Sequence, residues 1–428
     1  MPTSPSASPS ASVSISSLAA SSNSRSHLGS NLPSTSAVAK PDFAAVRADF
    51  PRAEEKLWLA AAETHPFSVH TLRALEQYTQ FRTWGSGENR HSFTPSMQQE
   101  TKELFAALIH AEPSEIAFVQ STTDGENVVL AGLGLSQPGV KAAGNVVIDD
   151  LHFEASKYMY KALERTGAIE LRIVNHRDWQ IDLSRIEAAV DQNTVLVSVA
   201  LVSQVNGYMA NAQAISQIAH AHGAYLYADI IQGAGCTPID VRALGIDFAA
   251  CTAYKWLMGD FGIGFLFVRQ ELQEQLRQSR YSLAQVQSVD DFDYQPLPGA
   301  VRYEGSRPSY LSAICVYEGL KYIHKLGVEN IRAHVKPLTD RLQSELPALG
   351  YRPLTPLDAP TPIVSFLPPH IEETQAKLDR AFGHQVVSFR QWYQTNHQGQ
   401  REMVQGIRLG VSVYNNQQDI DRFLNALQ

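Results

Sequence analysis

The 428-residue sequence predicts an α/β protein built around a mostly parallel sheet. Short apolar runs of strand length alternate with longer runs in which apolar residues recur at helical spacing. The run at 194–202 (TVLVSVALV) is almost continuously apolar, as expected for a strand that is covered on both faces. Hydrophobic residues make up 44% of the chain and charged residues 18%, which is enough apolar content for a packed core.

The elements are expected in a regular order along the chain. A short helix at 43–50 and an extended piece at 57–62 come first, and a helix at 96–110 follows them. Strands are then expected at 116–119, 145–148, 170–174, 194–202, 224–228, 248–252 and 264–268, and helices at 127–135, 154–165 and 211–222. After the stretch at 282–298, a helix at 311–326, strands at 363–367, 386–389 and 406–411, and a helix at 418–427 predict a second unit of α+β type.

The chain divides into three parts by composition and pattern. Residues 1–40 are rich in Ser, Ala and Pro and contain no acidic residue, so we expect a disordered tail that cannot bury enough apolar surface to offset its ordering entropy. An organelle-targeting segment is the alternative, although it would be richer in Arg. Residues 41–310 are expected to form a large α/β domain and residues 311–428 a small α+β domain, and residues 41–60 are able to pack with the small domain.

Charge and cysteine content exclude several classes of protein. A net charge of -8 disfavours binding to nucleic acid, and no apolar run approaches the roughly 18 to 20 residues that span a membrane. Three cysteines are too few for a disulfide framework, and their spacing is not that of a zinc site. These features predict a cytoplasmic protein with no metal, no nucleic-acid partner and no membrane partner.

A lysine lies where a ligand crevice is expected. Lys255 follows the strand at 248–252, and burial there would lower the pKa of its amine and make it competent to form a Schiff base. Asp229 ends the strand at 224–228, so its carboxylate lies at the carboxyl edge of the sheet. The two match what pyridoxal phosphate (PLP) requires, an amine for its aldehyde and an acid for its pyridine nitrogen. Taken alone, Lys255 also fits a surface lysine and Asp229 a helix cap.

A glutamine and a helix N-terminus add possible cofactor contacts. Gln232, three residues after the acid, is placed to hydrogen-bond the phenolic oxygen of the cofactor ring. Residues 121–125 (STTDG) join a strand to a helix, and free amides at such a point bind anions. Thr123, the amide of Asp124 and the hydroxyl of Thr252 are the expected phosphate contacts, with an ordinary helix cap as the alternative.

A histidine and an arginine complete the constellation. His152 lies between a strand and a helix, where a flat imidazole can stack on the cofactor ring; an ordinary loop histidine is the alternative. Arg408 lies in the apolar run at 406–411, and its planar guanidinium matches a carboxylate, so it suits an amino-acid substrate. A structural ion pair is the alternative for Arg408.

Residues 228–233 (ADIIQG) followed by residues 252–256 (TAYKW) resemble the class V, fold-type I PLP enzymes, such as cysteine desulfurases, kynureninases and isopenicillin N epimerase-like proteins. The resemblance spans about residues 45–428. It implies a large domain with a mostly parallel sheet of the seven-stranded type and a smaller α+β C-terminal domain. It also implies PLP as the cofactor, a small amino-acid substrate and a homodimer with a shared active site.

The resemblance assigns roles to matching positions. The catalytic residues would be Lys255 as the Schiff-base lysine, Asp229 and His152. The cofactor-binding residues would be Thr123, Asp124, His152, Gln204, Asp229, Gln232, Thr252, Tyr254, Lys255, Gly305 and Ser306. Gln204 lies where the family usually has Asn, and residues 304–308 look like the segment that reaches the phosphate of the neighbouring subunit. Arg408 would bind the substrate carboxylate.

Departures from the family pattern favour one reaction. Desulfurases carry a catalytic cysteine on a C-terminal loop, and no cysteine follows Cys315 here. The expected activity is therefore a C–S or other β-lyase that acts through an external aldimine without that cysteine. Epimerisation is the alternative, because residues 254–257 (YKWL) resemble the HKWL of epimerase-like proteins, and transamination comes third. Tyr208, Tyr254 and Tyr310 are candidates for a second proton donor.

Two other classes of protein stay open. A PLP-fold protein that binds without turnover is disfavoured by the intact set of Asp229, Gln232, Lys255 and Arg408. A nucleotide-binding α/β protein would need a glycine-rich phosphate loop after the first strand, and neither a Walker motif nor G-x-G-x-x-G occurs there.

Overall fold

The computed structural model describes residues 41–85, 93–136, 144–384, 386–395 and 400–428 and confirms the predicted α/β class. Contacts divide the chain into residues 1–40 and one compact unit, Pro41–Gln428. The disordered tail predicted from the sequence lies outside the described residues. None of the helices in the described ranges is long and apolar enough to cross a membrane.

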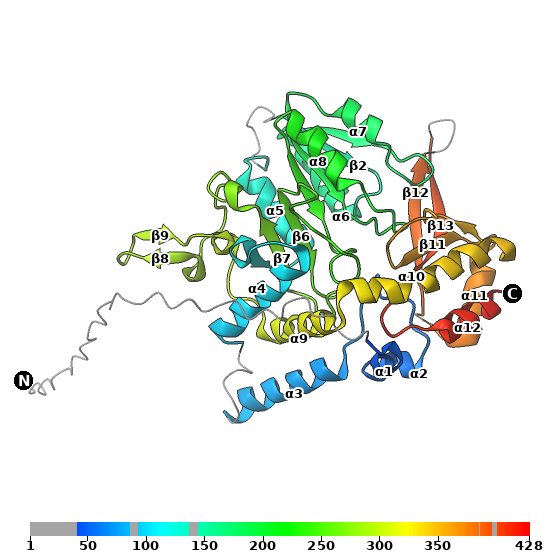
Figure 1. Ribbon diagram of the computed structural model, residues 1–428. Coiled ribbons are helices and arrows are strands. Elements are labelled where there is room, and N and C mark those ends of the chain that lie inside the picture. Colours follow the sequence, from blue (N-terminus) through cyan, green and yellow to red (C-terminus); the bar gives the residue numbers. More distant parts are fainter. Residues whose placement is uncertain (1–40, 86–92, 137–143, 385, 396–399) are drawn as a thin grey trace, which may run out of the picture. The chain divides into compact units, whose positions relative to one another are not determined.

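The main sheet has seven strands in the order β1-β7-β6-β5-β4-β2-β3 (Figure 1). The strands are β1 Ile116–Val119, β2 Asn145–Asp149, β3 Glu170–Val174, β4 Thr194–Ala200, β5 Tyr225–Asp229, β6 Phe248–Thr252 and β7 Gly264–Val268. β3, β2, β4, β5 and β6 are mutually parallel, whereas β7 is antiparallel to both β6 and β1. The carboxyl ends of five parallel strands therefore meet at one edge, which is where ligands of such sheets bind.

Helices cover both faces of this sheet, as its continuously apolar strands predict. Val146 and Ile148 of β2 belong to one buried cluster with Val129 of α5, whereas Val147 between them belongs to another with Ile109 of α4. The α-helices are α1 Phe43–Ala48, α2 Pro51–Glu55, α3 Val69–Trp84, α4 Pro95–Ile109, α5 Thr122–Gly132, α6 Glu154–Arg165, α7 Leu183–Ala189, α8 Ala212–Ala221, α9 Tyr310–Leu326, α10 Val328–Glu345, α11 Ile371–Phe382 and α12 Gln417–Leu427.

A second sheet is formed by the C-terminal part of the chain. Its order is β10-β11-β13-β12 and all its pairings are antiparallel. The strands are β10 Arg352–Pro353, β11 Ile363–Leu367, β12 Ser388–Thr395 and β13 Arg401–Gly410 (Figure 1). Apolar side chains of β11 and β13 form one buried cluster with side chains of α10, α11 and α12. A separate hairpin of β8 Val286–Ser288 and β9 Tyr294–Pro296 lies in the stretch at 282–298.

Several boundaries differ from those predicted from the sequence. α5 begins at Thr122, five residues before the predicted start, because Ser121 caps it through a hydrogen bond from the Asp124 amide. The strands expected at 386–389 and 406–411 are parts of the long pair β12 and β13. α3 was not predicted, because its only buried side chains are Thr71, Ala74 and Tyr78 and its apolar stripe is weak. α10 was also missed, and it contains Pro337, which is a signal against a helix.

The extended piece at 57–62 lies against the end of β13. The Gly410 amide donates a hydrogen bond to the Leu59 carbonyl at 2.7 Å, and Ala60 pairs with Gly410 as a parallel bridge. A Cβ atom on Gly410 would lie 2.3 Å from the Ala62 backbone nitrogen. Only glycine allows this approach, which brings the segment before α3 to the strand that carries Arg408.

We therefore expect Gly410→Ala to lower the free energy of unfolding by about 2 to 3 kcal/mol, because the methyl group meets backbone that cannot move aside. Chemical denaturation measures this change. Gly223→Ala is the control, since Gly223 has a φ of +76° but no atom within 4 Å of the added Cβ, so it carries only the conformational cost of about 1 kcal/mol. An equal cost at the two positions would contradict the close approach at Gly410.

Candidate active site

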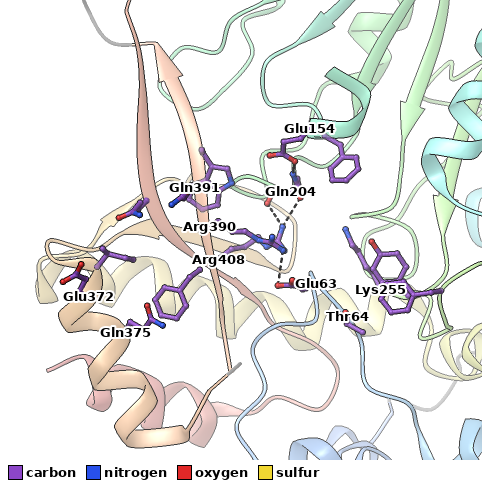
Figure 2. A pocket seen from close by; sticks show the side chains of 17 residues that line it. Glu63, Thr64, Glu154, Gln204, Lys255, Glu372, Gln375, Arg390, Gln391 and Arg408 are labelled. Carbon is purple, nitrogen blue, oxygen red and sulfur yellow. Dashed lines mark hydrogen bonds and ion pairs between the residues drawn. The ribbon is translucent and has the colours of Figure 1, made fainter. Parts of the chain in front are cut away.

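Lys255 lies in a cavity of about 900 Å³ lined by residues that follow β2, β4 and β6 and by residues of β12 and β13. Figure 2 shows Lys255 and Arg408 on facing walls of this cavity, with Gln204 and Glu63 beside the arginine. Of the residues predicted from the sequence, Gln204, Tyr254, Lys255 and Arg408 line it. The other predicted residues lie around it or at a second cavity.

The Lys255 side chain is buried in the turn after β6, with only 6% of the residue exposed. Burial lowers the pKa of its amine, and the positive charge of Arg408 lowers it further, whereas Asp229 acts in the opposite direction. The neutral form of the amine is therefore more populated near neutral pH than in an exposed lysine. This is the state in which an amine attacks an aldehyde or accepts a proton.

Asp229 ends β5, between β4 and β6, and is also buried. Burial raises the pKa of its carboxyl, while a hydrogen bond from the Ile231 amide at 3.0 Å and the charge of Lys255 lower it. In the part of the chain that the structure describes, no ion pair joins Asp229 to a cationic side chain. A buried carboxylate of this kind favours a positively charged partner from a ligand.

The Gln232 side chain connects two segments of the protein near the cavity. Its amide nitrogen donates to the Ala62 carbonyl at 3.0 Å, and its oxygen accepts a hydrogen bond from the Trp256 indole at 2.8 Å. Together, the two hydrogen bonds connect Trp256, the residue after Lys255, to the extended piece at 57–62 through Gln232. This role was not expected from the sequence, and a contact between Gln232 and a cofactor oxygen stays a prediction.

The start of α5 is clamped to the end of β6. The Thr122 amide donates to Thr252 Oγ1 at 2.7 Å, the Thr252 amide donates to Thr122 Oγ1 at 3.0 Å, and the two hydroxyls lie 2.9 Å apart. The Asp124 amide, expected from the sequence to face a phosphate, donates instead to Ser121 Oγ. Among the first amides of α5 as described, that of Thr123 has no protein acceptor, so it is the one available for an anion.

Asp124, Gly305 and Ser306 line a different cavity, of about 760 Å³. The Asp124 carboxylate forms an ion pair with Arg280, which also lines this second cavity. Burial raises the pKa of Asp124, but the hydrogen bond and positive charge of Arg280, together with a hydrogen bond from the Gln120 amide, outweigh burial and hold the pKa below the ordinary value. These three predicted residues therefore do not reach the Lys255 cavity of the same chain.

His152 is fully buried after β2 and is neutral. The Phe153 amide donates to His152 Nδ1 at 2.7 Å, and His152 Nε2 lies 3.0 Å from Ser198 Oγ. Burial, with a smaller effect of the positive charge of Lys157, lowers the pKa of His152 to about 3. The ring is thus fixed at both nitrogens in an uncharged form, as a stacking residue requires.

Arg408 is fully buried in β13 without a carboxylate partner among the described residues. Its Nη1 donates to the backbone carbonyl of Gln204 at 3.0 Å, and its Nε has no acceptor. The Gln204 side chain in turn donates to Glu154 (Figure 2). Burial lowers the pKa of Arg408 to about 10, and the charge of Arg390 contributes in the same direction. A buried guanidinium without a carboxylate partner is chemically suited to an anionic ligand, and a carboxylate matches its planar geometry.

Four charged residues that line the cavity were not predicted as site residues from the sequence: Glu63, Glu154, Glu372 and Arg390. Arg390 of β12 donates to the carboxylate of Glu63 at 3.0 Å, and Ser388 donates to the same carboxylate at 2.6 Å. Alternation along β12 contains a signal for Arg390. Ser388 pairs with Arg408 across the hairpin, and Arg390 lies two residues after Ser388, so Arg390 and Arg408 face the same side of the sheet. Glu63 lies in an irregular segment that has no such signal.

Of the three tyrosines considered as proton donors, Tyr254 lines the cavity. Its ring stacks on Phe261 with centroids 4.1 Å apart. Tyr208 instead donates to the Ile181 carbonyl at 3.2 Å, and Tyr310 lies against Phe93. The structure thus reduces the three candidates to one.

A family model described as aminotransferase class-V matches residues 58–423. Two curated relatives show the level of similarity. A probable cysteine desulfurase of Methanothermobacter thermautotrophicus is 27% identical over 310 residues, covering 71% of this chain and 76% of the relative. An uncharacterized aminotransferase of Bacillus subtilis is 29% identical over 289 residues, covering 68% of this chain and 75% of the relative.

Solved structures show the same fold. The apo structure of a cysteine desulfurase from Thermococcus onnurineus superposes with a TM-score of 0.75 at 23% identity, covering 89% of this chain and 96% of that chain. The cystine C-S lyase C-DES superposes with a TM-score of 0.74 at 16% identity, covering 88% of this chain and 98% of that chain. The seven-stranded sheet with an antiparallel C-terminal sheet is therefore a known architecture.

The burial of His152 makes a prediction about stability and pH. Because the folded pKa is about 3 against an ordinary 6.5, the unfolded chain takes up a proton that the folded chain refuses as the pH falls below 6.5. The contribution of His152 to stability is complete above that pH and is lost toward pH 3 at up to about 1.4 kcal/mol per pH unit. Chemical denaturation at several pH values should show a shallower loss for His152→Gln than for the wild type. Parallel profiles below pH 6.5 would contradict a buried, neutral His152.

Proposed function

Since the chain belongs to the class-V aminotransferase family, we propose that it binds PLP at Lys255 and catalyses β-elimination from an amino acid, with C–S lyase activity as the preferred form. The observation that carries the proposal is the buried amine of Lys255 facing the unpaired guanidinium of Arg408 across one cavity. An amino-acid substrate needs both groups, one near its amino group and one for its carboxylate.

The residues present fit the cofactor. The neutral amine of Lys255 suits the aldehyde, and the buried carboxylate of Asp229 suits a protonated pyridine nitrogen. The free amide of Thr123 at the start of α5 suits the phosphate, and the fixed, uncharged ring of His152 suits stacking. When bound, PLP supplies an electron sink that stabilises negative charge at the substrate Cα.

The side chains of the protein then have separate tasks. Arg408 would bind the substrate carboxylate through its guanidinium. The Gln204 carbonyl accepts a hydrogen bond from its Nη1, and Glu154 in turn accepts one from the Gln204 side chain. Lys255, once a substrate amine has displaced it from the cofactor, would remove the α-proton, because burial and the charge of Arg408 lower the pKa of its amine and favour the neutral form. Asp229 keeps the pyridine nitrogen protonated. Loss of the α-proton and of the β-substituent, followed by addition of water, would give pyruvate and ammonia from a β-substituted alanine. The substituent would leave as its own acid, which is hydrogen sulfide for cysteine and a persulfide for cystine.

The absence of a thiol from the cavity favours elimination over transfer of sulfur to the protein. None of the described residues that line the cavity is a cysteine, and Cys236, Cys251 and Cys315 are all buried elsewhere. Burial raises the pKa of Cys315 to about 12 and that of Cys236 above the range in which a thiolate forms. The proteins named above include a probable cysteine desulfurase and a cystine C-S lyase, and the structure of the lyase is a complex with its reaction product, cysteine persulfide.

Epimerisation is the second candidate, because Tyr254 places a phenol in the cavity next to Lys255. The Lys255 amine lies 5.5 Å from the centroid of the Tyr254 ring. Two proton carriers in one site are what inversion at Cα requires. Formation of pyruvate and sulfide supports elimination, whereas loss of optical activity with exchange of the α-hydrogen alone supports epimerisation.

The second cavity supports a homodimer with a shared active site. Gly305 and Ser306 lie away from the Lys255 cavity of their own chain, on a surface that also carries Arg280. In the family pattern this segment serves the neighbouring subunit. A second copy would therefore bring Ser306 and the amide of Gly305 to the phosphate.

The cofactor is tested by the absorbance of the purified protein. We expect a band at about 410–430 nm, which is typical of PLP bound to a lysine amine, with loss of the band on treatment with borohydride. Lys255→Ala should lack it, while Lys157→Ala, a lysine that donates to the Asp150 carbonyl outside the Lys255 cavity, should retain it. A colourless wild type that takes up no added PLP would overturn the proposal.

Arg408→Ala tests the substrate carboxylate. We expect KM for an amino-acid substrate to rise roughly 10- to 100-fold, the value of one charge-assisted contact, while the cofactor band stays in place. Arg242→Ala is the control, because it removes the buried ion pair with Glu115 far from the cavity and so tests general destabilisation. An unchanged KM in Arg408→Ala would remove this residue from the site.

A further inference from the structure

A fully buried carboxylate lies behind His152. Glu126 of α5 has no exposed surface, and no cationic side chain forms an ion pair with it in the described part of the chain. Its carboxylate accepts three hydrogen bonds, from Tyr160 at 2.7 Å, from Ser156 at 2.6 Å and from Ser198 at 3.0 Å. The donors come from α6 and β4, so this one acid joins three elements of the fold.

The hydrogen bonds from His152 to Glu126 run in one direction. The Phe153 amide can only donate, so His152 Nδ1, which accepts it at 2.7 Å, carries no hydrogen. The hydrogen must be on Nε2, which donates to Ser198 Oγ at 3.0 Å. Ser198 then directs its own hydrogen to Glu126 Oε1. The Glu126 carboxylate is the terminal acceptor of this chain, and the Tyr160 hydroxyl, which also donates to it, lies within hydrogen-bonding reach of Ser198.

Burying the carboxyl group of Glu126 costs free energy of desolvation, which an apolar side chain would not cost. Burial raises the pKa of Glu126 to about 7, the negative charge of Asp229 contributes to the rise, and the three hydroxyl donors oppose it. The titratable groups that face this network are Asp229 and Tyr227 of β5 and Tyr160 of α6, and Lys157 acts on the His152 end. A leucine would fill the same space without the desolvation cost. The acid is therefore explained by what it holds in place.

We propose that Glu126 is a positioning residue for His152: through Ser198 it holds the imidazole in one orientation and in the neutral form with hydrogen on Nε2. His152 then presents a fixed, uncharged ring face and does not act as a proton carrier. The role of this face toward PLP rests on the proposed function. The hydrogen-bond chain itself does not, because all of its members are side chains and backbone of this protein.

The first test uses the cofactor-free protein labelled with [15N]histidine. Long-range 1H–15N correlation spectra distinguish the two nitrogens of each of the 14 histidines, and His152→Gln identifies the His152 signals by their loss. We expect hydrogen on Nε2 and no titration near neutral pH. Hydrogen on Nδ1, or titration of His152 between pH 6 and 7, would overturn the proposal; this range is about that of an ordinary histidine.

The second test asks whether Glu126 itself matters. In Glu126→Leu the Nε2 hydrogen of His152 should exchange with solvent at least about tenfold faster, because one hydrogen bond of the chain is lost. Glu126→Gln keeps an acceptor oxygen and should stay near the wild type. Glu115→Gln is the matched control, since Glu115 is an equally buried acid that is paired with Arg242 far from His152. Wild-type exchange in Glu126→Leu would overturn the assignment.

A triple variant separates positioning from stability. Glu126→Leu leaves the hydroxyls of Tyr160 and Ser156 buried without an acceptor, so the single variant is expected to be unstable. Adding Tyr160→Phe and Ser156→Ala removes these unsatisfied donors and should restore much of the stability, while Ser198 still lacks its acceptor. If the triple variant also regains slow exchange at His152, the role of Glu126 is only structural and the proposal fails.

The same variants report on the cofactor. If PLP binds, the triple variant should bind it about tenfold more weakly than the wild type, with an altered circular dichroism signal of the bound cofactor, whereas Glu115→Gln should match the wild type. Wild-type affinity for PLP together with fast exchange at His152 would show that Glu126 does not affect cofactor binding. Failure of the wild type to bind PLP overturns the proposed function but leaves the exchange experiment decisive for the hydrogen-bond chain.

Discussion

Lys255 holds a primary amine in the interior of the protein beside one buried acid and two arginines. Charging this amine is opposed by its burial and by the positive charges of Arg408 and Arg390, and is favoured by Asp229 and, less strongly, by Cys251. The net effect lowers the pKa of the amine and so favours its neutral form, which is the reactive one. The proposed chemistry depends on this balance, because Arg408 and Asp229, the two charged side chains with the largest effect on it, are those proposed to bind the substrate carboxylate and the cofactor.

The wall that carries Arg408 is joined to the wall that carries Lys255 by backbone contacts. Gly410 lets the piece at 57–62 approach β13, and the amide of His65, just beyond this piece, donates to the Tyr254 carbonyl at 3.0 Å. Gln232 ties the same piece to Trp256. A segment distant in sequence from both Lys255 and Arg408 therefore sets their separation. Charged groups held by backbone hydrogen bonds keep a fixed distance more reliably than groups held by long side chains.

Two buried acids of this fold illustrate different solutions to one physical problem. Glu115 is neutralised by Arg242, as buried carboxylates usually are. Glu126 instead depends on three hydroxyl groups and has a raised pKa. The second solution leaves the acid free to serve as an acceptor for His152 through Ser198. It also places a second acid near Asp229, whose negative charge contributes to the raised pKa of Glu126.

The sequence alone determined the class of the fold and the groups for which we propose the chemistry. Strand lengths, apolar runs and the spacing of Asp229, Gln232 and Lys255 are local properties, because burial on both faces and the position at a strand end are visible in the pattern itself. Polar helices such as α3 were missed, since few of their side chains are buried.

The tertiary structure decided which groups meet. Glu63 and Arg390 enter the cavity, whereas Asp124 pairs with Arg280 away from it. Glu126 reaches His152 through Ser198. These contacts join residues that lie 46 to 327 positions apart in the chain. Their geometry depends on how the elements pack, and a single sequence carries no local signal for it.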